Sequence, residues 1–241
     1  MWGDRIAKVL KEAQYPETWP YTAQDFSRLD ESSDLLFYSH QGWFIISTTL
    51  LLEHSPSSID NTLFPIFDIL DVCSSWVSHY PDDYKARWVA GIGLNELELS
   101  KNPRLDTYDV IDLQENPTFP YPNERFDIVT MVVSVDYLTK PLQVFREIGR
   151  VLRSKGTAYI SFSNRCFPTK AVSVWLSASN DWQRVYIVGS FFHYTEMFDT
   201  PTAYDLSPDG VLQVIVTTCA SQVIAKTIIL DPLYMVTANK L

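Results

Sequence analysis

The chain has 241 residues, enough for one domain with a substantial hydrophobic core. Hydrophobic residues make up 46% and aromatic residues 14% of it, a composition that excludes a disordered chain. The formal net charge is -10 and no basic run occurs, so we expect no nucleic-acid partner, because phosphate backbones are bound by clustered lysines and arginines.

The cysteines and the apolar segments indicate a reducing compartment and no membrane partner. Cys73, Cys166 and Cys219 are odd in number and widely spaced, which argues against a disulfide framework and against a zinc or other metal site. The first dozen residues lack the apolar core of a signal peptide. The most apolar windows, 42–52 and 211–230, are too short or interrupted by polar residues to span a membrane. We expect a cytoplasmic protein, or a plastid protein if a transit peptide precedes this chain.

Residues 1–58 are predicted to form an N-terminal helical extension ahead of an α/β domain. Residues 1–14 suit an amphipathic helix, and 43–53 suit an apolar one. The acidic stretch 30–38 between them has two interpretations. It is either a solvated, capped helix start or a lid over a ligand.

From residue 59 onward, short apolar strands alternate with helices. The first strand, 66–72, is apolar along most of its length, as is typical of a strand buried on both faces of a parallel sheet. Four more strands are predicted at 88–92, 108–113, 126–135 and 157–164. One helix begins after Asn95 as its N-cap, and another begins at Pro141 and is closed by Gly156.

The remaining residues complete the predicted domain, which spans 59–241. A helix is expected over 170–176, a sixth strand over 184–193 and a final strand over 231–241. The β-branched segment 211–230 is an extra hairpin or a segment that packs poorly. Repeated strand–helix–strand units predict a doubly wound α/β fold, with a mostly parallel seven-stranded sheet and helices on both faces.

Polar residues follow the first strand directly. Asp71 ends the strand, and Cys73, Ser74 and Ser75 form the turn after it. Open α/β sheets bind ligands at such turns, although an ordinary strand-to-loop junction has the same composition. Nothing in the adjacent sequence activates Cys73, so we expect no covalent catalysis.

Residues 120–162 are the most specific part of a family resemblance. A proline–aromatic–proline run precedes F-D-I-V, and R-V-L-x-x-x-G precedes the fifth strand. This pattern resembles the class I S-adenosylmethionine-dependent methyltransferases. More narrowly, the motifs D-V-C-S-S-W, V-V-S-V-D-Y-L-T-K-P, S-F-S-N-R-C-F and V-G-S-F-F-H-Y resemble a methyltransferase-like group of plants, algae and photosynthetic bacteria.

The resemblance implies S-adenosylmethionine as cofactor and S-adenosylhomocysteine as product. The residues that it places around the cofactor are Asp71, Cys73, Ser74, Ser75, Gly91, Leu94, Asn95, Asp112, Leu113 and Ser134. The chain departs from the family in two places. The glycines of the first loop correspond to Cys73, Ser75 and Val77, and Val77 is a poor replacement where a positive φ angle is needed. The acid at the end of the second strand corresponds to Gly93, with Asn95 or Glu96 as substitutes.

The resemblance places the methyl acceptor beyond strands four to six. The candidates are His193, Asp136 and Tyr137 for catalysis, and Asn164, Arg165 and Tyr194 for substrate binding. Each has a structural alternative: a hydrogen-bonded histidine near a strand end, a loop cap at Asp136 and Tyr137, and a surface ion pair at Arg165. His79 is interpreted as an ordinary helix position under the first loop.

Two functions remain open on this sequence. The first is a methyltransferase acting on a small molecule. The second is a non-catalytic binding or assembly module that keeps the sheet but has lost the cofactor. A dinucleotide-dependent oxidoreductase is disfavoured because no G-x-G-x-x-G follows any predicted strand. The sequence does not predict the acceptor or the oligomeric state.

Overall fold

The computed structural model of the chain describes residue 10 and residues 13–29, 66–80, 84, 86–207, 213–219, 222–228 and 232–241. The predicted helix over 43–53 and the acidic stretch 30–38 lie outside these residues, as does most of the predicted helix over 1–14.

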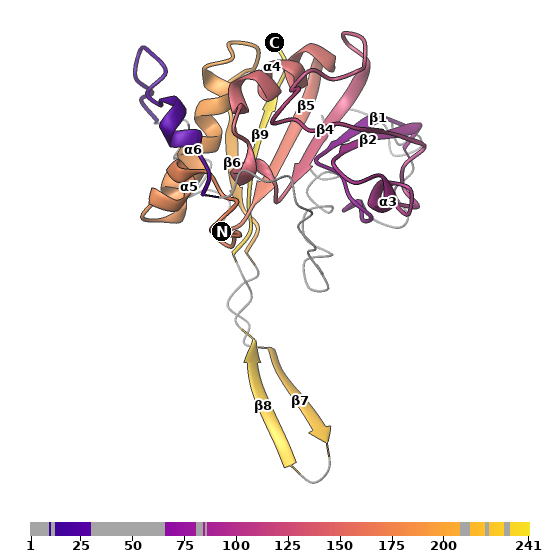
Figure 1. The fold of residues 1–241 in the computed structure, drawn as a ribbon, viewed down its shortest axis with the longest axis vertical. Coiled ribbons are helices and arrows are strands. Elements are labelled where there is room, and N and C mark those ends of the chain that lie inside the picture. The colour runs from indigo at the N-terminus through magenta and orange to yellow at the C-terminus, as the bar shows by residue number, and fades with distance from the viewer. Residues whose placement is uncertain are drawn as a thin grey trace, which may run out of the picture.

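Seven strands form one sheet, in the spatial order β3-β2-β1-β4-β5-β9-β6 (Figure 1). The strands are β1 (Asp68–Val72), β2 (Trp88–Gly93), β3 (Thr107–Val110), β4 (Phe126–Val132), β5 (Leu152–Phe162), β6 (Thr202–Asp205) and β9 (Tyr234–Asn239). Strands β1 to β5 pair in parallel, and β9 runs antiparallel between β5 and β6. This confirms the predicted α/β fold with a mostly parallel seven-stranded sheet, the arrangement expected from class I methyltransferases.

Short helices connect the strands. They are α3 (Glu96–Leu99), α4 (Pro141–Val151), α5 (Ser173–Ser177) and α6 (Asp181–His193), with 3-10 turns η1 (Ala23–Phe26) and η2 (Val135–Tyr137). The side chain of Asn95 accepts a hydrogen bond from the backbone N–H of Leu97 at 3.0 Å, so Asn95 is the predicted N-cap. Pro141 begins α4 as predicted. No helix in the described part of the chain is long and apolar enough to cross a bilayer.

The predicted sixth strand, 184–193, is wrong: these residues belong to helix α6. Asn180 caps the helix by accepting a hydrogen bond from Gln183 N at 3.0 Å. Val185, Val188 and Phe192 are fully buried at helical spacing. The β-branched residues of this segment favoured a strand locally, but packing against the sheet decides the outcome. The sixth strand of the fold is β6.

Gly156 does not cap α4, which ends at Val151 with Leu152 as its C-cap. Gly156 lies within β5 instead. A Cβ atom there would lie 2.9 Å from the carbonyl oxygens of both Arg153 and Asp127, so the close approach of two backbones requires glycine.

Both faces of the sheet carry apolar side chains. Leu70 and Val72 of β1 belong to the larger core cluster, which also contains residues of α4 and α6. Ile69 points to the opposite face and packs in a smaller cluster with Tyr80 and Met235. All five residues of β1 are buried, as a central parallel strand requires.

The segment predicted as a hairpin forms one. β7 (Gln213–Cys219) and β8 (Gln222–Ile228) pair antiparallel in a sheet of their own.

The amino ends of β1 and β4 hold a network of ion pairs. The buried carboxylate of Asp68 accepts hydrogen bonds from Arg87, Arg125 and Arg153 at 2.8, 2.5 and 2.9 Å. Asp127 pairs with two of the same arginines, Arg87 and Arg153. Burial alone would raise the pKa of Asp68, but the hydrogen bonds from the three arginines outweigh it and lower the pKa.

Candidate functional site

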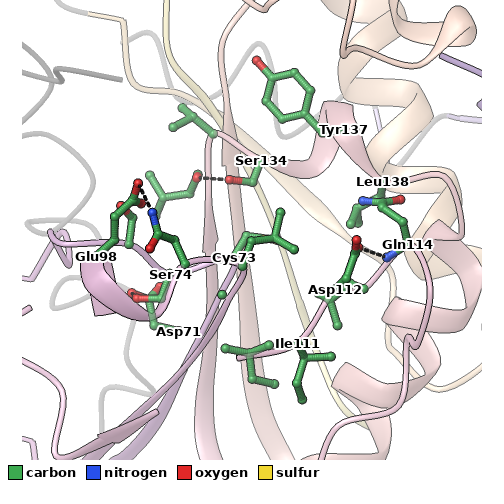
Figure 2. Close-up of a pocket in the computed structure, with 18 of the residues that line it drawn as sticks. Asp71, Cys73, Ser74, Glu98, Ile111, Asp112, Gln114, Ser134, Tyr137 and Leu138 are labelled. Atoms are coloured by element: carbon green, nitrogen blue, oxygen red, sulfur yellow. Dashed lines mark hydrogen bonds between the residues drawn. The ribbon is translucent and has the colours of Figure 1, made fainter. Parts of the chain in front are cut away.

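A cavity of about 210 Å³ lies at the carboxyl ends of β1 to β4. Of the residues that the resemblance places around a cofactor, the cavity is lined by Asp71, Cys73, Ser74, Ser75, Leu94, Asn95, Asp112, Leu113 and Ser134. Figure 2 shows Asp71, Ser74 and Glu98 on one side of the cavity and Asp112 with Gln114 on the other. The structure therefore brings together residues that lie far apart in the sequence.

Asp71 holds the loop after β1 in place through hydrogen bonds. Its carboxylate accepts hydrogen bonds from the hydroxyl groups of Ser74 at 2.7 Å, Ser78 at 3.0 Å and Thr130 at 3.0 Å. Burial raises its pKa to about 6, against the opposing effect of these hydroxyl donors. Asp71 is therefore mostly ionised at neutral pH and is the negative charge at the base of the cavity.

Further hydrogen bonds hold the same loop without glycine. Ser74 N donates to the carbonyl oxygen of Ile92 at 2.7 Å, and Asn102 Nδ2 donates to that of Ser75 at 2.7 Å. Within this loop the φ angle is positive at Cys73, where it is 57°, and not at Val77. A non-glycine residue in this conformation costs on the order of 1 kcal/mol.

Val133, directly after β4, also has a positive φ angle, of 44°. A β-branched residue rarely adopts this conformation. Cys73 and Val133 follow neighbouring strands, and both line the cavity. Backbone strain of this kind collects at functional sites, where the surrounding hydrogen bonds maintain it.

The surroundings of Cys73 disfavour the thiolate form of its side chain. Burial and the nearby carboxylates of Asp71, Asp136 and Asp112 raise its pKa to about 12. The thiol therefore stays protonated at neutral pH.

Glu98, which sequence reasoning missed, places a carboxylate at the cavity near the end of β2. A Cβ atom on Gly93 would lie 2.2 Å from the carbonyl oxygen of Ser74, so no acid fits there. Glu98 of α3 lines the cavity instead, and its carboxylate accepts hydrogen bonds from Ser75 Oγ at 2.5 Å and Asn95 Nδ2 at 3.0 Å. An N-cap followed three residues later by glutamate is the capping-box pattern, which was a usable signal.

Two other residues proposed for this side do not line the cavity. Glu96 is exposed on α3. Gly91 is buried within β2, where a Cβ atom would lie 2.7 Å from a methyl carbon of Leu105, so its role is in packing.

The loop after β3 forms the opposite side. Asp112 lies beyond the end of the strand, and its Oδ1 accepts a hydrogen bond from Gln114 N at 2.8 Å. The amide oxygen of Gln114 accepts hydrogen bonds from Thr139 N at 2.7 Å and from the hydroxyl group of Thr139 at 2.5 Å. This contact joins the loop after β3 to the one that precedes α4.

Of the catalytic candidates, Tyr137 lines the cavity and Asp136 does not. Asp136 is buried, and its Oδ2 has no hydrogen-bond partner among the described residues. Burial raises its pKa to about 8, so this carboxyl group is largely protonated at neutral pH.

His193 lies at the C-terminal end of α6, exposed and outside the cavity lining. Its ring stacks on Tyr15 at 4.5 Å between centroids. The hydroxyl group of Tyr194 donates to the carbonyl oxygen of Pro16 at 2.7 Å. Both residues thus contact the N-terminal segment, and neither reaches the cavity.

Asn164 and Arg165 are exposed and also lie outside the cavity lining. Three residues that the sequence analysis did not select line it instead: Arg28, His79 and Lys170. His79 lies in the loop after β1, in no helix. Lys170 follows the S-N-R-C-F motif closely, which was its only signal in the sequence.

Comparison with known proteins gives one family match. Residues 90–160 match the family model described as a methyltransferase domain. No curated protein matches the chain. The matched residues include Glu98, Asp112 and Ser134, so the match spans the loops after β2, β3 and β4.

The solved structures similar to this chain share little sequence with it. The [4+2]-cyclase SpnF is 18% identical with a TM-score of 0.42, over 59% of this chain and 55% of that chain. An S-adenosylmethionine-dependent methyltransferase from Mesorhizobium loti is 12% identical with a TM-score of 0.43, over 72% of this chain and 90% of that chain. One from Aquifex aeolicus is 14% identical with a TM-score of 0.43, over 73% and 82%.

Proposed function

We propose that the chain is an S-adenosylmethionine-dependent methyltransferase that acts on a small molecule. The observation that carries this proposal is a set of three carboxylates around one cavity, at the carboxyl ends of three adjacent parallel strands: Asp71 in β1, Glu98 in α3 after β2, and Asp112 after β3. The methyltransferase-domain match and the strand order support it independently.

The residues present fit this cofactor by the chemistry of their donor and acceptor groups. The cofactor carries a net positive charge, two ribose hydroxyl groups and an adenine amine, and each of these groups is bound well by carboxylates. We assign Asp71 and the loop Cys73–Ser75 to the methionine side, Glu98 with Asn95 to the ribose, and Asp112 with Leu113 to the adenine.

When bound, the cofactor supplies a methyl group on a positively charged sulfur. The protein needs to hold the acceptor in line with that group and to exclude water, since orientation supplies much of the rate. Ser134 and Tyr137 follow β4 and line the cavity above the first loop (Figure 2). We assign them to the acceptor, which their hydroxyl groups would hydrogen-bond and hold in line with the methyl group.

Calorimetric titration with S-adenosylhomocysteine and S-adenosylmethionine tests the proposal, with NADH as the control ligand. We expect selective binding of both adenosyl compounds. Glu98→Gln should weaken binding about tenfold, because a charge-assisted hydrogen bond to the ribose is lost. Glu96→Gln, the same change on the same helix outside the cavity, should leave affinity unchanged. Folded wild-type protein that binds neither compound would leave the non-catalytic module as the function.

A further inference from the structure

The carboxylates and the cations at the cavity come from different parts of the fold. Asp71 lies in β1, Glu98 in α3 after β2, and Asp112 after β3, whereas Arg28 comes from the N-terminal segment and Lys170 from the loop after β5. The chain as a whole carries a formal charge of -10. Because the chain is acidic, the presence of two cationic side chains at one cavity needs an explanation.

Hydrogen bonds between Ser27 and Ser173 fix the two segments that carry these cations. The backbone N–H and the hydroxyl group of Ser173 both donate to the carbonyl oxygen of Ser27, at 2.9 and 3.0 Å. The two hydroxyl oxygens are also 3.1 Å apart. Arg28 follows Ser27 directly, and Lys170 lies on the chain just before Ser173, so this contact holds both cations at the cavity.

An unpartnered donor atom of Arg28 indicates a ligand, and Lys170 lines the same cavity. Lys170 is only 5% exposed although it lines the cavity. The Nε atom of Arg28 is buried, and within the described part of the chain it has no hydrogen-bond partner. A buried donor without an acceptor costs free energy, and a guanidinium group matches the geometry of a carboxylate or a phosphate.

On the premise of the proposed function, we propose that Arg28 and Lys170 bind an anionic group of the methyl acceptor, a carboxylate or a phosphate. The cofactor is a cation overall, so the carboxylates at the cavity attract it, and Arg28 and Lys170 repel it. An anionic acceptor has the opposite preference. The carboxylates at the cavity thus favour the cofactor, and the two cations favour the acceptor. The acceptor is therefore an organic acid or a phosphate ester.

Calorimetry with three probes of similar size tests the proposal: 4-hydroxybenzoate, phenyl phosphate and the neutral 4-hydroxybenzamide. Each is titrated into cofactor-free protein and into protein saturated with S-adenosylhomocysteine. We expect at least one charged probe to bind about tenfold more tightly than the amide. Arg28→Gln and Lys170→Gln should abolish this preference, and Lys170→Arg should retain it. Arg146→Gln, a change at an exposed arginine of α4 outside the cavity, should also retain it.

The outcomes separate this proposal from its rivals. A preference for the benzoate identifies an organic acid, and one for phenyl phosphate identifies a phosphate ester. Three results overturn the proposal: equal binding of all probes, no binding of either charged probe, or a preference that survives in both glutamine variants. Weaker binding of S-adenosylhomocysteine to Arg28→Gln with unchanged probe preference also overturns it, because the cation then serves the cofactor carboxylate. If the Lys170→Gln variant does not fold, the Arg28→Gln variant supplies the test, because Arg28 is only half-buried.

Failure of the proposed function gives a different result. In that case the wild-type protein binds no S-adenosylhomocysteine, while the anion preference is still measured in the cofactor-free protein.

Discussion

The carboxylates at the two ends of the parallel strands have different hydrogen-bond partners and opposite pKa shifts. At the amino ends, Asp68 and Asp127 are each paired with arginines, and the pKa of Asp68 is lowered. At the carboxyl ends, the described donors to Asp71 are hydroxyl groups, and burial raises its pKa to about 6. The backbone strain at Cys73 also lies at the carboxyl ends. The ion pairs at the amino ends stabilise the fold, and the carboxylates at the carboxyl ends are the ones that we propose to bind the cofactor.

The largest expected effect is the loss of stability when Asp68, at the amino end of β1, is replaced. Asp68→Asn leaves three arginines without their shared carboxylate and should reduce the free energy of unfolding by about 3 kcal/mol. This is the lower end of the range for breaking a buried ion pair, because the arginines are partly exposed. Urea denaturation measures the change. Affinity for S-adenosylhomocysteine should stay the same in the folded variant, and a parallel loss of affinity would contradict the separation of the two ends.

The two ends should also respond to pH with opposite signs. The pKa of Asp71 is higher in the folded state than in the unfolded state, so its contribution to stability is complete below about pH 4 and is lost as pH rises through about 6. The loss is on the order of 2 kcal/mol. The pKa of Asp68 is lowered, so its contribution is present above about pH 4 and is lost as pH falls further.

Unfolding measured between pH 3 and pH 7, in wild type and two variants, separates these contributions. Asp71→Asn should flatten the pH dependence from about pH 4 to 6, and Asp68→Asn should flatten it below about pH 4. Identical pH profiles in both variants would show that neither carboxyl group titrates as its surroundings imply.

The smallest effect concerns strain at the carboxyl ends. At Cys73, where φ is positive, the glycine variant should be about 1 kcal/mol more stable than the alanine variant. Cys166 is the matched control, because its φ angle is not positive, and there alanine should be the more stable of the two. Thermal unfolding of the four variants gives both comparisons. The same order at both positions would argue against strain at Cys73.

Neighbouring residues in the sequence were enough to predict several elements of the fold. The fully buried strand β1, the cap at Asn95 and the start of α4 at Pro141 each follow from neighbouring residues. Helix α6 was mistaken for a strand because its β-branched residues favour one, and only packing against the sheet makes it helical.

The missed parts of the candidate site depend on contacts between distant segments. Glu98 reaches the cavity beside Ser75, and Arg28 is held there through hydrogen bonds between residues 146 positions apart. The sequence showed that the loop after β1 lacks the family's glycines, but placing a positive φ angle at Cys73 required the folded loop. Spacing along a chain gives no information on such contacts.

The contact between Gly93 and the first loop limits how this site can change over evolutionary time. An aspartate at position 93 cannot be tolerated while the carbonyl oxygen of Ser74 lies where its Cβ atom would be. An acid at position 93 therefore requires the backbone of the loop after β1 to move first. A designer who wants a carboxylate at the end of β2 would rebuild that loop before changing Gly93.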